Sequence, residues 1–154
     1  MFFRFLKVFI VAMLPLVELR LAIPISQAMH LPVIPSYIVA IIGNMLPVPF
    51  IYYFARRVLE WGAAQTRASK FFRYFLEKGE AAGAKLEAKA GRGLFFALML
   101  FVAIPLPGTG AWTGTLGASI LDMDFKKTCL ACMSGVLCSG LLMMAISHLI
   151  FHTL

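Results

Sequence analysis

The fold of this 154-residue chain is decided by a break in an apolar segment, which reads PLPGTGAWTG from Pro105 to Gly114. The two prolines remove backbone donors, and the glycines favour backbone angles that a regular helix does not use. The residues on either side, from 94 to 121, are mostly apolar. Irregular backbone at membrane depth survives only where it is buried in protein or lines a water-filled cavity. The break therefore predicts a re-entrant hairpin tip or an unwound site, with a kink used only for packing as the simpler alternative.

The composition around this break requires a solvent other than water. Hydrophobic residues make up 61% of the chain and charged residues 14%, whereas soluble domains contain roughly 45–50% and 25%. A soluble fold of this length has too little interior for so many apolar side chains. We therefore predict an all-α integral membrane protein, and the same composition excludes a disordered chain or a secreted disulfide scaffold.

The positive charge is concentrated in one linker, residues 56–92. The chain has a net charge of +7, and nine of its fourteen basic residues lie in this linker beside four acidic residues. Such a segment is typical of a cytoplasmic loop under the positive-inside rule, so we expect no nucleic-acid partner. Phe71, Phe72 and Phe75 share one helical face, which predicts an amphipathic helix on the lipid headgroups or packed on the membrane domain.

The two halves on either side of the linker resemble each other. A shift that lays Gly43 on Gly135 also lays Leu14-Pro15 on Leu106-Pro107. Each half is predicted to contain a broken segment followed by one transmembrane helix. Two re-entrant segments would give the halves opposite orientations, as in the inverted repeats of transporters, whereas full spans would make them parallel. The predicted units are residues 1–55 (broken segment 8–29, transmembrane helix 33–55) and 93–154 (broken segment 94–121, transmembrane helix 128–152).

Glu18 and Arg20 are the ionisable residues of the first broken segment, between Pro15 and Pro24. An ionisable side chain in an apolar segment is by default a functional candidate. Glu18 suits a group that loads and releases a proton, and Arg20 requires an anion, a phosphate or backbone carbonyls as its partner. Residues two apart do not face each other on a helix, so an ion pair between them would need unwound backbone. A purely structural ion pair at the hairpin tip is the alternative.

The second break offers backbone amides in place of charges. Gly108 and Gly110 leave N–H groups free at the start of the following half-helix, where anions are attracted. Thr109 and Thr113 add hydroxyls, and Trp112 adds a large amphipathic wall. No Lys-Ser/Thr pair follows, which argues against a nucleotide-binding loop. The predicted substrate and proton site comprises Glu18, Arg20, Pro107, Gly108, Thr109, Gly110, Trp112 and Thr113.

The last apolar block carries Cys129 and Cys132 at a spacing that places both thiols on one helical face. No further ligands complete a metal site, so we predict neither a metal nor a cofactor. Small residues spaced four apart on the same helix predict close helix packing, and Asn44 in the first half is expected to hydrogen-bond across the interface. The predicted packing residues are Gly43, Asn44, Ala131, Gly135 and Ser139.

Two motifs resemble those of the small multi-drug export protein family: PLVELRLAIP from Pro15 to Pro24, and PLPGTGAWTG from Pro105 to Gly114. The resemblance covers nearly the whole chain and implies a bacterial or archaeal membrane protein that exports small compounds. The chain is also distantly similar to DedA-like proteins, which implies translocation of a lipid or polyprenyl phosphate. It differs from the small multidrug resistance proteins, which are shorter and lack both the Pro-Gly pattern and the linker.

Three functions follow as hypotheses. The first is a proton-coupled exporter of small cationic compounds, in which proton and substrate share Glu18. The second is a translocator of an anionic lipid headgroup, held by Arg20 and the free amides. The third is a structural membrane subunit that transports nothing. We expect no enzyme, membrane lipids as neighbours, a prokaryotic inner-membrane location with the linker in the cytoplasm, and consider a homodimer that encloses the pathway.

Overall fold

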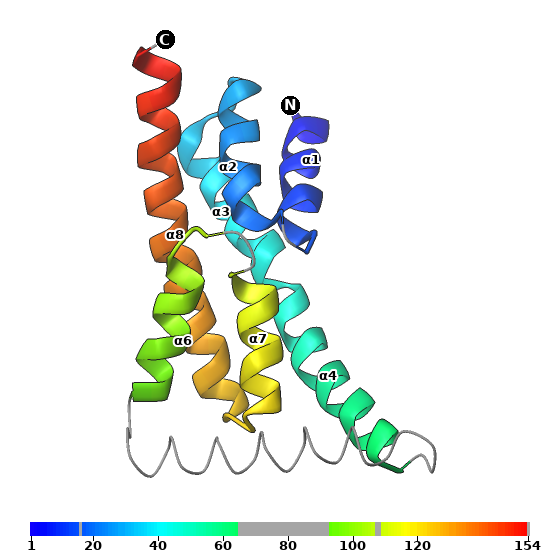
Figure 1. Cartoon of the computed structure of the whole chain (residues 1–154). Coiled ribbons are helices and arrows are strands. Elements are labelled where there is room, and N and C mark those ends of the chain that lie inside the picture. The colour runs from blue at the N-terminus through cyan, green and yellow to red at the C-terminus, as the bar shows by residue number, and fades with distance from the viewer. Residues whose placement is uncertain (16, 65–92, 107–108, 154) are drawn as a thin grey trace.

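The computed structural model describes residues 1–15, 17–64, 93–106 and 109–153. Their regular structure is entirely helical, which confirms the predicted all-α class for this part of the chain (Figure 1). The predicted linker helix with its three phenylalanines lies outside the described residues. The helices are α1 (Phe2–Met13), α2 (Glu18–Ala28), α3 (Val33–Met45), α4 (Pro47–Ala64), α6 (Gly93–Ala103), α7 (Ala111–Ile120) and α8 (Phe125–Thr153).

The helices form two hairpins beside two long helical columns. Figure 1 shows α1 and α2 as a hairpin at one end of the molecule and α6 and α7 as a hairpin at the other end. The turns of the two hairpins face each other near the middle of α8, while α3 continues into α4 along the opposite side. We call α1–α2 the first hairpin and α6–α7 the second hairpin. This arrangement brings residues near position 18 close to residues near position 110.

Two stretches are long and apolar enough to cross a membrane, Val33–Ala55 in α3 and α4 and Phe125–Ile150 in α8. They overlap the predicted transmembrane helices, and each exceeds the roughly 20 residues that a bilayer core requires. Large apolar side chains point outward along both, such as Phe50, which is 71% exposed, and Leu130, which is 61% exposed. A surface of this kind suits lipid rather than water.

The break in the first hairpin is shorter than the sequence suggested. Leu14 is extended (φ −71°, ψ 136°) because a residue before proline is pushed out of the helical region, and here Pro15 follows it. Pro24, in contrast, lies inside α2. The helix carries on through Pro24, so the interruption that positions the hairpin tip is confined to the residues between Met13 and Glu18.

Both hairpins finish in the same kind of turn. His30 after α2 and Asp122 after α7 have positive φ angles of 53° and 56°. In each turn the N–H of the next residue bonds back to a carbonyl in the last helical turn, which is the pattern of a Schellman motif. These bonds run from Leu31 to Ser26 (3.0 Å) and from Met123 to Ala118 (2.9 Å).

The predicted packing glycines lie where helices cross closely. A Cβ atom on Gly43 of α3 would lie 2.6 Å from the carbonyl oxygen of Phe9 in α1. A Cβ atom on Gly135 of α8 would lie 2.6 Å from Cβ of Val102 in α6. Only glycine allows these approaches. Gly43 lets α3 pack closely against α1, and Gly135 lets α8 pack closely against α6.

The other predicted packing residues are buried, but the side-chain oxygen of Asn44 has no bonding partner among the described residues. Ala131 and Ser139 are 0% and 3% exposed on α8. Asn44 is 2% exposed, and within the described ranges its Oδ1 has no hydrogen-bond partner. Its neighbours one turn away on the same buried face, Ala40 and Val48, are apolar and offer no donor.

The cysteines of α8 are free thiols. Cys132 is fully buried, and its Sγ lies 3.5 Å from the hydroxyl oxygen of Thr115 in α7. This weak hydrogen bond joins the second hairpin to α8, which is a packing role.

Candidate functional site

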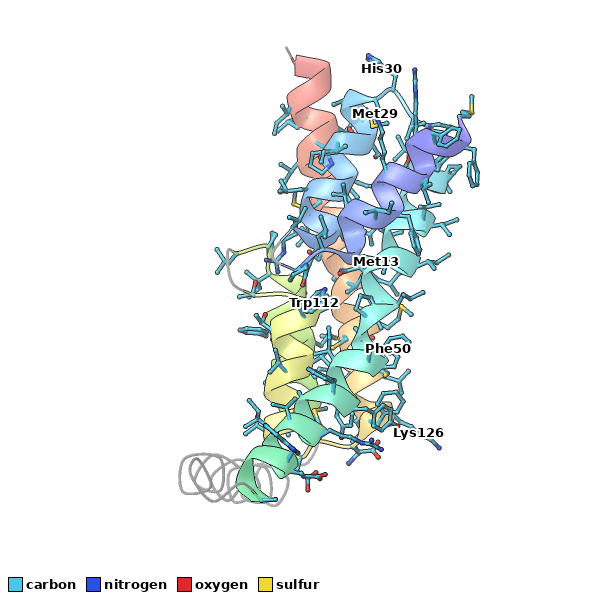
Figure 2. All side chains as sticks on the ribbon, turned by 90° about the vertical axis from the view of Figure 1, so that its right-hand side faces the viewer. Met13, Met29, His30, Phe50, Trp112 and Lys126 are labelled. Carbon is cyan, nitrogen blue, oxygen red and sulfur yellow. The ribbon has the colours of Figure 1, made fainter. Side chains whose placement is uncertain are left out.

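The two hairpin tips meet at mid-height in the molecule. In Figure 2, Met13 from the first hairpin and Trp112 from the second lie between Met29 and His30 at one end and Lys126 at the other. The indole Nε1–H of Trp112 donates a hydrogen bond to the carbonyl oxygen of Met13, at 3.2 Å. This bond closes one side of the junction between the hairpins.

Glu18 begins α2 and is held in an unusual backbone conformation. Its φ is 50°, in the left-handed region that residues other than glycine rarely adopt. Its side chain is only 4% exposed. Such a conformation costs energy that the surrounding structure must offset, and it occurs at functional sites as well as in turns such as those at His30 and Asp122.

The Glu18 carboxylate binds the start of α7 in the second hairpin. Oε1 accepts the backbone N–H of Trp112 at 3.0 Å, and Oε2 accepts that of Ala111 at 3.3 Å. The first N–H groups of a helix have no partner within the helix and lie at the positive end of its dipole. Glu18 therefore acts as an N-terminal cap that the first hairpin supplies to a helix of the second.

Gly110 makes room for this cap. It precedes α7 with a φ of 130°, which side chains rarely allow. A Cβ atom at this position would overlap the Glu18 carboxylate. The residue that would ordinarily cap α7 thus has no side chain, and the carboxylate of Glu18 occupies the space.

Arg20 binds the opposite pole of the second hairpin. Its Nη2 donates to the carbonyl oxygen of Ile104 at 3.0 Å and to Oγ1 of Thr109 at 2.7 Å, and its Nη1 donates to the carbonyl oxygen of Leu106. These carbonyls follow the last turn of α6, the negative end of that helix. The sequence allowed an anion, a phosphate or backbone carbonyls as partners of Arg20, and in the structure it bonds to backbone carbonyls.

Thr109 supports this arrangement from within the tip of the second hairpin. Its hydroxyl accepts from Arg20 and lies 2.9 Å and 2.8 Å from the carbonyl oxygens of Ile104 and Leu106. Its single O–H can donate to either of the two carbonyls that the guanidinium binds. Thr113, in contrast, makes a local bond of 3.5 Å to the carbonyl oxygen of Gly110 and no bond to the first hairpin among the described residues.

The structure brings together five of the eight predicted site residues. We call their cross-hairpin hydrogen bonds the tip contact. Glu18 and Arg20 bond to the second hairpin rather than to each other, because two residues spaced this way on one helix diverge. Pro107 and Gly108 lie outside the described residues. The five that meet are Glu18, Arg20, Thr109, Gly110 and Trp112.

The remaining partners in the tip contact were predicted only as kinds of group, free amides at a helix start and backbone carbonyls, and not by position. They are backbone groups: the amide of Ala111 and the carbonyls of Met13, Ile104 and Leu106. Every residue has the same main-chain groups, so residue identity does not indicate which of them take part. The predicted helix start near Gly110 indicated only the approximate position of the amides.

Two apolar stretches long enough to cross a bilayer, and a glutamate buried between two hairpins, indicate a helical membrane protein. A family model described as "Putative small multi-drug export protein" matches residues 18–142, and the chain belongs to this family. The predicted family is thereby confirmed, and with it the general class of membrane transporter. No curated protein and no solved structure matches the chain. The similarity to DedA-like proteins stays a prediction.

Proposed function

We propose that this protein exports a small cationic compound in exchange for protons, with the Glu18 carboxylate as the group both compete for. The observation that carries the proposal is the tip contact itself. A buried carboxylate of one hairpin holds the first amides of a helix in the other hairpin, midway between the two ends of the molecule.

The dimensions of the hairpins support a re-entrant arrangement. Their helices contain 10 to 12 residues each. At about 1.5 Å per residue, they extend about 15–18 Å, which is roughly half of a hydrocarbon core about 30 Å thick. Hairpins of this length that enter from opposite faces would meet near the midplane. Their polar tips could lie at that depth because each satisfies the hydrogen bonds of the other.

Proton and cation would act on the same two oxygens. Charged hydrogen bonds to a helix N-terminus depend on the negative charge of the carboxylate. A proton on Glu18 removes that charge and weakens its hold on Ala111 and Trp112. A cation that pairs with the carboxylate draws it away from the same amides. Occupation by one therefore disfavours the other, which is the requirement for exchange.

The test is proton flux in liposomes that contain the purified protein, driven by a gradient of a cationic drug. Glu18→Gln keeps the size and a hydrogen-bond acceptor but cannot carry the charge, so it should abolish flux. Asp124→Asn is the matched control, because Asp124 accepts the Lys127 N–H at 3.0 Å at another helix start, away from the tips. Drug-driven flux that survives Glu18→Gln would refute the proposal.

A second function is favoured by a different observation. Arg20 and the first amides of α7 lie in one tip contact, and both are groups that bind phosphate elsewhere. An anionic lipid headgroup could displace Glu18 from the amides and the carbonyls from Arg20. Flipping of a labelled lipid phosphate that Arg20→Ala abolishes would support this function, and flipping that it leaves intact would exclude the role. If both substitutions alter only folding, the protein is a structural subunit.

The orientation belongs to the same proposal. Lys126 lies at the end of the molecule toward which α4 runs before the chain enters its basic linker (Figures 1 and 2). The positive-inside rule assigns this end to the cytoplasm. A two-hairpin arrangement then places the N-terminus on the opposite side. A homodimer is compatible with the exposed apolar faces, and cross-linking in native membranes tests it.

A further inference from the structure

An apolar groove runs between α4 and α7, next to the tip contact. Its volume is about 370 Å³, within the usual range for a small-molecule site. Only apolar side chains of α4 and α7 line it, and Phe54 at its edge is 72% exposed. In a bilayer the open side of this groove would face hydrocarbon. The side chains used below are Ala55 of α4 and Trp112 and Ile120 of α7.

We infer that this groove binds the apolar body of the transported compound, which enters it sideways from the bilayer. The inference rests on the proposed exporter function and specifies where its substrate lies. It assigns the substrate a chemistry, a lipophilic body joined to a cationic head. A soluble polar cation without such a body would gain nothing from the groove.

Trp112 connects the groove to the tip contact. Its side chain lines the groove, its amide N–H donates to Glu18, and its indole N–H donates to the carbonyl of Met13. A compound lying along the groove therefore contacts the residue that holds the two hairpins together. The face of an indole ring also attracts cations. A cationic head at the end of the groove next to Trp112 would thus lie beside the indole ring and near the Glu18 carboxylate, with which the cation would pair.

Two other hollows on the described surface lack this connection. One of about 520 Å³ on α4 is lined by Arg57 and Glu60 as well as aromatic side chains, and it contains no residue of the tip contact. Another of about 230 Å³ between α6 and α7 includes Thr113 but none of the residues that join the hairpins. The groove between α4 and α7 alone among these combines an apolar lining with a member of the tip contact.

The test uses Trp112 as its own reporter. Trp61→Phe removes the other tryptophan, which is 65% exposed. The probe is a quaternary ammonium that carries a brominated alkyl chain, added to this variant in liposomes. Bromine quenches tryptophan at contact, so binding in the groove should quench Trp112 in a saturable way. Quenching that rises without saturation would show partition into lipid only and would overturn the inference.

Filling the groove should weaken binding. Ala55→Leu adds bulk from α4 and should raise the dissociation constant about tenfold or more, as extra methylenes in an apolar pocket commonly do. Ala145→Leu is the control, because Ala145 is exposed on α8 and outside the groove. Ile120→Phe fills the groove from α7 and provides a second variant if the first does not fold. Equal affinities in the filled and control variants would contradict the inference.

Flux measured on the same samples separates the two proposals. Saturable quenching without any drug-driven proton flux would leave the groove as a binding site and remove the exporter function. Intact flux in Ala55→Leu, together with unsaturable quenching in the parent, would keep the exporter function and remove the groove from it. Loss of both binding and flux on filling the groove is the expected result.

Discussion

The first and second hairpins have the same shape and opposite chemistry. Each is a pair of short helices that ends in the same kind of turn. The first presents the ionisable side chains of Glu18 and Arg20 at its tip, whereas the second meets them with backbone amides and carbonyls and the hydroxyl of Thr109. The shift that lays Gly43 on Gly135 also lays Glu18 on Gly110. The carboxylate of one half thus fills the space that the missing side chain leaves in the other. If the two halves are related as the sequence predicts, their difference at this equivalent position is one of those that let them build a single site.

The largest effect is expected where this difference is removed. Gly110→Ala places a methyl group on the Glu18 carboxylate at a φ of 130°. It should cost on the order of 3 kcal/mol of unfolding free energy and abolish flux, measured by denaturation in detergent and in liposomes. At Gly117 an added Cβ meets nothing within 4 Å, so Gly117→Ala should be neutral or slightly stabilising. Equal unfolding free energies and equal flux in the two variants would show that Gly110 is not needed for Glu18 to cap α7.

Arg20→Ala tests the other pole of the comparison. The substitution leaves the carbonyls of Ile104 and Leu106 without their charged donor. A hydrogen bond to a charged group contributes about 1.5–3 kcal/mol to the unfolding free energy. We expect a loss of about 2 kcal/mol in unfolding free energy. Arg20→Lys should recover only part of it, because an ammonium cannot reach three acceptors in the geometry of a guanidinium. Full recovery by lysine would mean that charge alone matters here.

Trp112→Phe removes one hydrogen bond and keeps an aromatic ring. Loss of the bond to the Met13 carbonyl should cost about 1 kcal/mol of unfolding free energy. Trp61→Phe is the matched control at an exposed position, where we expect a change within about 0.5 kcal/mol. A cost at Trp112 no larger than at Trp61 would show that the indole N–H does not join the hairpins.

The smallest effects separate the two threonines of the second tip. Thr109→Ala should cost about 1 kcal/mol because Thr109 bonds to Arg20 and to the tip carbonyls, whereas Thr113→Ala should cost less than about 0.5 kcal/mol. Thermal unfolding of both variants in one detergent makes the comparison. A greater loss of unfolding free energy in Thr113→Ala than in Thr109→Ala would contradict this assignment and indicate that the important contacts lie further along α7.

Local chemistry made much of this molecule predictable. Proline and glycine disfavour a regular helix, so the break between α6, which ends at Ala103, and α7, which begins at Ala111, could be located from residue identity, as could the two long apolar stretches. The predicted break extended to Gly114, which lies inside α7. The prediction of a break at Pro24 was wrong, because a helix can continue through a proline when its surroundings compensate for the lost hydrogen bond. The membrane re-entry of the hairpins and the internal repeat stay predictions.

The positions of the partners in the site could not be predicted because the partners are non-local and belong mostly to the main chain. Glu18 and Trp112 are 94 positions apart, and no pattern along the sequence states that they meet. Glu18 and Arg20 stood out because charge is costly in an apolar segment. Which groups would satisfy them depended on how the two hairpins face each other, and this is a property of the whole fold.

The reach of Glu18 across the molecule has a consequence for biogenesis. As the chain is synthesised, the carboxylate and guanidinium of the first hairpin are made long before the amides and carbonyls that satisfy them. If the hairpins re-enter the membrane as proposed, the first must keep its polar tip in contact with water or with the insertion machinery until the second arrives. The N-terminal half would then not reach its final depth alone, and insertion would be completed only after the second hairpin is made.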